Sequence, residues 1–329
     1  MVGDDLPALA LRLLERQPPP GPVIAPELLA PGTLAELIAI LARPETPAHP
    51  ALLASLVLKY AHAYVHPEHL GEDVSLADLT VLAGRFVRRR SGSALLSGQH
   101  ELRRLLLHHG FALQMLLDLP KTVHLLTALL AANPDASGRF LGLDCGAGTG
   151  ILLLGTYLLA RRHGVAAPTL MGFEVQPQVA ARADGLLSSL GVGRVRRADA
   201  TRPETYAALP EGPVACLANE TLPSAGRRLY KEPFPAISAA LFAALGPRLS
   251  RTVFLPEAVW ASDRPGREWL RLAPENAFVG DARGLAKPLR LAFMRDVELA
   301  GQRVPVERVG EGLAWLVAEP WREALCRRW

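Results

Sequence analysis

Cysteine and long apolar runs are scarce in this chain of 329 residues, and each scarcity excludes a class of protein. The three cysteines, Cys145, Cys216 and Cys326, stand far apart without metal-ligand spacing, so the sequence predicts neither a disulfide framework nor a zinc site. No apolar stretch reaches about eighteen residues without a charge or a breaker, so no membrane-spanning helix is expected. The first twenty residues carry acid where a secretory signal carries base. We therefore expect a cytoplasmic protein without a membrane partner.

Basic charge is also limited. Lysine and arginine number 36 against 32 acidic residues, which gives a formal net charge of +4. This balance permits an acidic partner without requiring one. The arginine-rich segment 85–92 contains one aromatic residue, Phe86, where a single-stranded nucleic acid would need several rings for its bases to stack on. Nucleic acid is therefore not favoured as a partner.

Residues 1–137 are predicted to form an all-helical N-terminal domain. Apolar residues recur there at three- and four-residue spacing, as in the face that contains Leu53, Leu56 and Tyr60. Prolines such as Pro44 and Pro120 are expected to separate the helices. The predicted helices cover residues 6–17, 32–42, 49–65, 75–90, 100–119 and 121–133.

From residue 138 to residue 329 the pattern changes to an α/β domain. Short apolar runs alternate with segments of helical period, which predicts βαβ units in a doubly wound, mostly parallel sheet with helices on both faces. The sequence after about residue 289 predicts further β-structure that could supply closing antiparallel strands. The predicted strands cover 139–145, 168–175, 192–199, 212–220 and 251–258, and the predicted helices cover 150–164, 176–191 and 234–246.

A glycine-rich turn follows the first predicted strand in the segment FLGLDCGAGTG, residues 140–150. Gly146, Gly148 and Gly150 can adopt positive φ and bring the main chain against a ligand, at the sheet edge where ligands of parallel sheets bind. Their spacing differs from the Gly-x-Gly-x-x-Gly of dinucleotide sites, and the Gly-Lys-Ser/Thr of a P-loop is missing. Asp144 precedes the turn and suits a cation or a hydrogen-bond donor better than a pyrophosphate.

The segment LDCGAGTG resembles motif I of the class I S-adenosylmethionine-dependent methyltransferases, and the resemblance extends over residues 139–260. It implies S-adenosyl-L-methionine as cofactor, held by the turn. It further implies that Glu174 accepts hydrogen bonds from the ribose hydroxyls and that Asp199 meets the adenine amino group. The cofactor-binding residues it implies are Asp144, Cys145, Gly146, Ala147, Gly148, Thr149, Gly150, Glu174, Asp199, Ala200 and Asn219.

The methyl acceptor would lie near the end of the fourth predicted strand, which runs into Asn219 and Glu220. The Asn/Asp-Pro-Pro-Tyr/Phe of enzymes that methylate bases or glutamine is missing there. The region has a weaker resemblance to protein arginine methyltransferases, which implies Glu220 and Glu232 as catalytic carboxylates that hold a cationic acceptor. The two glutamates are twelve residues apart, longer than the usual loop of that family, and its Thr-His-Trp segment is missing.

We expect a methyltransferase that acts on a small molecule or a protein side chain. The acceptor atom stays open. By analogy with related enzymes, the helical domain would serve as a substrate lid or as the interface of a homodimer. The alternatives are a nicotinamide-dependent oxidoreductase, an RNA methyltransferase and a catalytically inactive cofactor-binding interaction module.

Three histidines stand at helix-like spacing in the N-terminal region: His62, His66 and His69. Such spacing can serve a metal ion, but Pro67 breaks the helix between them and no carboxylate-rich segment accompanies them. We therefore expect surface histidines and no metal site.

Overall fold

The computed structural model describes part of the chain, and the described residues fall into two compact units. The helical unit takes its residues from 1–131, 148–164 and 176–195, and the sheet unit from 132–147, 165–175 and 196–329. The units interleave along the chain, and the predicted domain boundary after residue 137 stays a prediction. The described residues are 29–79, 109–110, 112–113, 115–117, 119–136, 138–221, 234–255, 259–262, 270–272, 297–299, 302–304 and 315–318.

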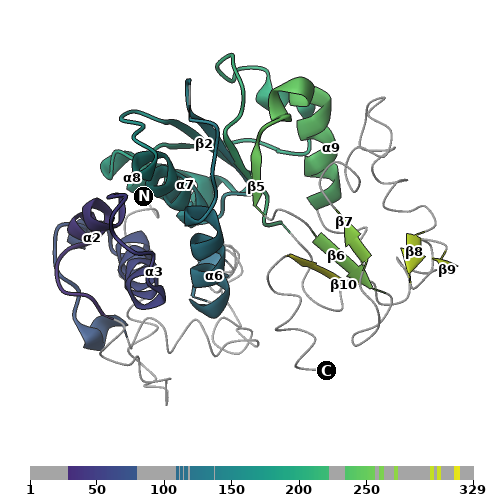
Figure 1. Ribbon diagram of the computed structural model, residues 1–329. Coiled ribbons are helices and arrows are strands. Elements are labelled where there is room, and N and C mark those ends of the chain that lie inside the picture. Colours follow the sequence, from purple (N-terminus) through teal and green to yellow (C-terminus); the bar gives the residue numbers. More distant parts are fainter. Residues whose placement is uncertain are drawn as a thin grey trace, which may run out of the picture. The chain divides into compact units, whose positions relative to one another are not determined.

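Five strands form a parallel sheet, of which β2 and β5 are labelled in Figure 1. The order of the strands is β3-β2-β1-β4-β5. Each lies within a predicted run, which confirms the α/β class. β1 is central and all of its residues are buried, as its apolar composition requires. The strand order reverses between β1 and β4, and such a reversal is where parallel sheets bind ligands. The strands are β1 (Leu141–Cys145), β2 (Thr169–Glu174), β3 (Arg194–Arg197), β4 (Cys216–Ala218) and β5 (Val253–Leu255).

Helices connect these strands at the predicted positions: α7 (Ile151–Arg162) follows β1, α8 (Pro177–Ser189) follows β2, and α9 (Phe234–Leu245) precedes β5. Short 3-10 helices occur at η3 (Pro203–Tyr206) and η5 (Gly246–Leu249). In the sheet unit, the apolar side of α9 and residues of β1 belong to one buried cluster.

The helical unit contains α2 (Leu34–Leu41), α3 (Pro50–Val65), η2 (Pro67–His69) and α6 (Leu119–Leu130), together with α7 and α8. α2 and α3 confirm two of the predicted helices. α3 contacts α2, α6 and α8, so all of its residues from 53 to 65 are buried. The predicted helix 6–17, and most of those at 75–90 and 100–119, lie outside the described residues.

α6 begins earlier than predicted. Pro120 lies in its first turn, where a missing N–H leaves no hydrogen bond unmade. The helical residues before it end at Leu116, so the predicted separation of two helices near Pro120 is confirmed. α6 then packs closely on α7: a Cβ added to Gly155 would lie 2.7 Å from Leu126 Cδ2 and 2.8 Å from Leu129 Cδ2. Glycine is needed at this contact.

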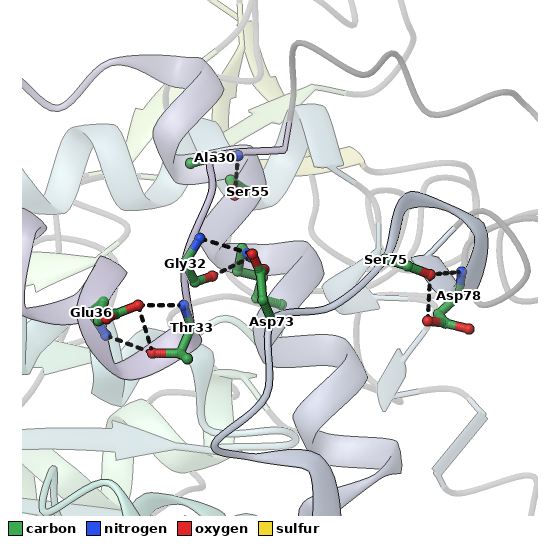
Figure 2. A network of polar contacts seen from close by, with 9 residues as sticks. Ala30, Gly32, Thr33, Glu36, Ser55, Asp73, Ser75 and Asp78 are labelled. Atoms are coloured by element: carbon green, nitrogen blue, oxygen red, sulfur yellow. Dashed lines mark hydrogen bonds and ion pairs between the residues drawn. The ribbon is translucent and has the colours of Figure 1, made fainter.

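A polar network ties the start of α2 to α3 (Figure 2). Thr33 and Glu36 form a capping box at the N-terminus of α2. The buried ammonium group of Lys59 donates to the Gly32 carbonyl oxygen and, at 2.6 Å, to Asp73 Oδ1, while Asp73 Oδ2 accepts from the Gly32 N–H at 3.0 Å. The hydrogen bond from Lys59 lowers the pKa of the Asp73 carboxyl. The buried charge is therefore paired, as burial requires.

The last part of the chain confirms the predicted β-structure. β6 (Val259–Ser262) pairs antiparallel with both β7 (Leu270–Leu272) and β10 (Trp315–Ala318), and β8 (Val297–Leu299) pairs with β9 (Gln302–Val304). These strands form separate sheets, so the expectation that they close the parallel sheet is wrong. Both edges of β6 are taken by its own neighbours, which leaves it no edge for β5.

Within the described residues, none of the helices combines the length and the apolar character that a membrane crossing requires.

Candidate functional site

In the sheet unit, polar side chains gather at the carboxyl ends of three neighbouring strands. Asp144 of β1 is paired with Gly172 of β2 on one side and with Ala218 of β4 on the other. Glu174 ends β2, and Asn219 directly follows β4. Asp144 is only 2% exposed, and Glu174 and Asn219 are also buried. Three of the predicted site residues therefore lie at one edge of the sheet.

The turn after β1 has the backbone conformation that its glycines permit. Gly146, Gly148 and Gly150 have φ of 73°, 53° and 83°, so all three lie in the left-handed region that favours glycine. The N–H groups of Gly146 and Ala147 both donate to the carbonyl oxygen of Phe173 at 2.9 Å, which anchors the beginning of the turn on β2. The prediction of a positive-φ turn is confirmed.

The side chain of Cys145 points into the protein core. Its thiol is fully buried in the apolar cluster of the sheet unit and lies 3.7 Å from the Tyr206 hydroxyl. Burial raises the pKa of this thiol to about 12, so it stays protonated. A ligand at the strand ends would meet Cys145 only through its backbone.

Asp199, which follows β3, is held by its own turn. Its Oδ1 accepts from the Thr201 hydroxyl at 2.6 Å and from the Thr201 N–H at 3.0 Å, and its Oδ2 lies 3.3 Å from Arg202 Nε. The Thr201 hydroxyl contributes most to lowering the pKa of this carboxyl, and Arg202 adds to the effect. Asp199 is therefore a carboxylate that stabilises its own turn through Thr201 and Arg202.

The same turn is fixed to β2 and to a buried tyrosine. The Ala198 N–H donates to the Glu174 carbonyl oxygen at 3.1 Å, and the Tyr206 hydroxyl donates to the Ala200 carbonyl oxygen at 2.6 Å. The predicted residues Glu174, Asp199 and Ala200 thus lie on two connected strand ends.

At the end of β4 a hydrogen-bonded chain runs from the strand to α9. The Thr221 hydroxyl donates to Asn219 Oδ1 at 2.7 Å, and Asn219 Nδ2 donates to Ser238 Oγ at 3.1 Å. Glu220 lies between Asn219 and Thr221 in the sequence, and it is partly exposed. Thr221 also packs on the glycine turn, because a Cβ added to Gly146 would collide with its methyl group. Glu232, the second predicted catalytic glutamate, lies outside the described residues.

The second half of the glycine turn belongs to the helical unit, where α3 contacts it. The Tyr60 hydroxyl donates to the Thr149 carbonyl oxygen at 2.6 Å, and both residues are buried. On Gly150, an added Cβ would lie 2.6 Å from Leu187 Cδ1 and 3.3 Å from Tyr60 Oη. The sequence placed Tyr60 on an apolar helix face, and nothing in its pattern distinguished it from a core residue.

Two of the three N-terminal histidines are buried, so the prediction of surface histidines is wrong for them. His62 and His66 are 6% and 5% exposed, whereas His69 is about half exposed. The reason is that α3 packs against three helices and has little free surface. α3 ends at Val65, as Pro67 predicted, but the 3-10 turn that follows keeps the His69 ring 5.6 Å and 5.8 Å from the other two ring centroids.

Within the histidine cluster, the protonation of His62 is perturbed. Burial and the neighbouring His66 lower the pKa of His62 to about 4. In the described part of the chain, histidine, cysteine, aspartate and glutamate side chains form no group of three or more that could hold a metal ion.

No protein-family model matches this chain, and no curated protein matches it. What the described residues define is a parallel α/β fold of the general Rossmann type, with a left-handed glycine turn after its central strand and carboxylates at the neighbouring strand ends.

Proposed function

We propose that this protein is an S-adenosyl-L-methionine-dependent methyltransferase. The observation that carries the proposal is the turn after β1, in which three alternate glycines have positive φ directly after the buried Asp144. Such a turn lets a ligand lie against the main chain at the point where the strand order reverses. Asp144 favours a ligand with cationic groups over one with a pyrophosphate, because opposite charges attract strongly at a buried position.

The end of β2 suits the nucleoside part of such a cofactor. Glu174 offers carboxylate oxygens, which accept hydrogen bonds from paired ribose hydroxyls. The next residue, Val175, is 57% exposed, which is unusual for a large apolar side chain among the residues that the structure describes. A planar base could cover it, so that the carboxylate orients the sugar and the apolar group packs on the base, as in other small-molecule sites.

Glu220 is the residue that we assign to the acceptor. When bound, S-adenosyl-L-methionine would supply an electrophilic methyl group. The protein has to hold the nucleophile in line with that group, and a carboxylate can orient an amine, a guanidinium or a hydroxyl and take its proton. The hydrogen bonds from Thr221 through Asn219 to Ser238 hold the side chains on both sides of Glu220, and the Asn219 N–H donates to the Leu255 carbonyl oxygen at 2.8 Å. Glu232 is the proposed second carboxylate.

Cofactor binding is tested by calorimetry with S-adenosylhomocysteine and, separately, with NADH. We expect saturable binding of S-adenosylhomocysteine alone, weakened at least about tenfold by Glu174→Ala, because the loss of a charged hydrogen-bond acceptor costs about 1.5–3 kcal/mol. The exposed Glu211→Ala is the matched control and should bind as the wild type does. Binding of NADH alone would favour an oxidoreductase, and binding of neither would favour an interaction module.

Glu220→Gln tests the catalytic assignment. Release of S-adenosylhomocysteine is followed with three acceptor pools: a small-metabolite extract, arginine-containing peptides and total RNA. In the pool that supports turnover, we expect Glu220→Gln to abolish transfer while the affinity for S-adenosylhomocysteine stays within a few-fold. Glu211→Gln again serves as the matched control. Wild-type turnover by Glu220→Gln would remove this residue from the mechanism.

A further inference from the structure

One buried hydroxyl group of α3 reaches the backbone of the glycine turn. Tyr60 is 0% exposed, and its hydroxyl donates to the Thr149 carbonyl oxygen over 2.6 Å. Both residues belong to the helical unit. The contact joins residues 89 positions apart in the sequence. A buried hydroxyl in such a position has to make a hydrogen bond, since an unsatisfied one costs free energy.

This hydrogen bond fixes the orientation of a whole peptide group. The peptide between Thr149 and Gly150 is planar, and in a trans peptide the carbonyl and the next N–H point in opposite directions. When Tyr60 holds the Thr149 carbonyl, the Gly150 N–H is directed away from Tyr60. Glycine accepts either sign of φ, so the sterics of Gly150 alone do not prevent this peptide from turning over. The observed φ of 83° is therefore held by neighbouring groups.

α8 limits the same position sterically. Leu187 packs where a Cβ of Gly150 would be, at 2.6 Å from Cδ1. Gly150 is thus enclosed by α3 and α8, and its O atom then accepts the first hydrogen bond of α7, from the Leu154 N–H at 3.1 Å. A changed orientation of the Thr149–Gly150 peptide would therefore disturb the first turn of α7.

We propose that Tyr60 is a positioning residue for the cofactor turn: its hydroxyl holds the Thr149–Gly150 peptide in a single orientation and thereby makes α3 a support of this part of the turn. The proposal rests on the proposed function for the identity of the ligand. It assigns the helical region a role as a permanent support of the turn, in place of the lid or dimer interface that analogy suggested.

The chain contains a matched control on the same helix. Tyr64 lies one turn after Tyr60, is 2% exposed, and has its hydroxyl 3.0 Å from His109 Nδ1 instead of from the turn. Tyr60→Phe and Tyr64→Phe each remove one hydroxyl from a buried site of α3. A purely structural role would therefore give similar losses of thermal stability and no difference in ligand affinity.

The experiment measures the Kd for S-adenosylhomocysteine and the hydrogen exchange of the Gly150 amide in both variants. We expect Tyr60→Phe to raise the Kd about three- to tenfold, the range of one net hydrogen bond, and Tyr64→Phe to leave it within twofold. The Gly150 amide should exchange several-fold faster in Tyr60→Phe only. Equal Kd values and equal exchange rates in the two variants would overturn the proposal.

Failure of this inference can be separated from failure of the proposed function. If the wild type does not bind S-adenosylhomocysteine, the proposed function fails, whereas the exchange rate of Gly150 still decides the role of Tyr60. If Tyr60→Phe does not fold, 3-fluorotyrosine in the otherwise wild-type chain replaces it. The ligand should then shift the fluorine resonance of Tyr60 and leave that of Tyr64 in place, and an unshifted Tyr60 resonance would contradict the proposal.

Discussion

Two tyrosines, one in each compact unit, donate a buried hydroxyl to a backbone carbonyl of a candidate-site loop. In the sheet unit, Tyr206 donates to Ala200, six residues away in the chain, and in the helical unit Tyr60 donates to Thr149, 89 residues away. The first clamp can form as soon as its own turn forms. The second requires that α3 has already packed beside the start of α7. The tyrosine that holds the turn after β3 is thus close in sequence, whereas the tyrosine that holds the turn after β1 comes from a distant part of the sequence. Both turns are in addition hydrogen-bonded to β2.

The interiors of the two units differ in the polar and titratable side chains that they bury. The core cluster of the sheet unit consists of apolar side chains and Tyr206. In the helical unit, α3 alone buries Lys59, His62 and His66. A buried titratable group makes stability depend on pH where its pKa in the folded state differs from its pKa in the unfolded chain. The sheet unit also buries titratable groups, Asp144 and Glu174 at its strand ends. Burial lowers the pKa of His62 in the helical unit, so we expect acidification from about pH 6.5 to 4 to act on the helical unit. Changes of backbone geometry are expected to act most strongly on the sheet unit.

The largest effect is expected for Gly146→Ala in the sheet unit. The new methyl group would have to sit at φ of 73° and would collide with the Thr221 methyl group. Gly164→Ala in the helical unit is the control: its φ is 80°, but no atom lies within 4 Å of the added Cβ. We expect a loss of about 1–2 kcal/mol for Gly164→Ala and of at least about 3 kcal/mol for Gly146→Ala, measured by urea unfolding.

A second substitution sharpens this prediction. Thr221→Ser removes the colliding methyl group and keeps the hydroxyl that donates to Asn219. In the Gly146→Ala background it should restore part of the lost stability and part of the affinity for S-adenosylhomocysteine. Equal stability of Gly146→Ala and Gly164→Ala would show that Thr221 does not confine the turn.

The next largest effect concerns His62 and pH. Its pKa is about 4 in the folded protein against an ordinary value of 6.5, so the unfolded chain binds the proton more readily between these values. Stability should therefore fall as the pH is lowered from about 6.5 to 4, by at most about 3 kcal/mol, and level off below. The charged groups around it are His66 and His69, which lower its pKa further, and Glu68 and Asp78, which raise it.

His62→Gln should remove this part of the pH dependence, and His124→Gln, on an exposed position of α6, should leave it unchanged. The measurement is urea unfolding at a series of pH values, with hydrogen exchange of α3 and β1 amides followed separately. Acid should increase exchange in α3 before it does so in β1. Simultaneous changes in both elements would mean that the helical unit is not the pH-sensitive one.

The smallest effect is expected for Tyr206→Phe. It removes the hydrogen bond to Ala200 and should lower the free energy of unfolding by about 1 kcal/mol. Asp199 stays held by Thr201 and Arg202, so the affinity for S-adenosylhomocysteine should change by less than twofold. A loss of affinity as large as that of Tyr60→Phe would remove the distinction between the two clamps.

The parts of the fold that the sequence predicted are those encoded locally. The central strand β1 lies inside a predicted apolar run because a strand buried on both faces needs an uninterrupted apolar segment. The edge strand β3 is rich in arginine and buries only Val195, and it was predicted from its place in the βαβ alternation. The left-handed turn after β1 was predicted because glycine is the residue that adopts positive φ without strain. The polar residues at the strand ends followed from the parallel arrangement itself, since all carboxyl ends meet at one edge.

What the sequence did not reveal depends on contacts between distant segments. Tyr60 had the pattern of an ordinary core residue, and its partner at Thr149 could not be inferred from spacing. His62 and His66 were assigned to the surface because Pro67 breaks the helix and no carboxylate-rich segment accompanies them, but the sequence of α3 does not show how many helices pack around it. The separate sheet of β6, β7 and β10 likewise reflects which strands pair, a choice that strand propensity does not encode.

The interleaving of the two units has a consequence for synthesis on the ribosome. The helical unit takes its last helix, α8, from residues that end at Ser189, whereas α6 ends at Leu130. At translation rates of about 5–20 residues per second, the faces of α3 and α6 that pack on α7 and α8 wait roughly 3–12 s for their partners. During that interval the nascent polypeptide presents bare apolar surface, so we expect its yield in cells to respond to chaperone supply and to growth temperature.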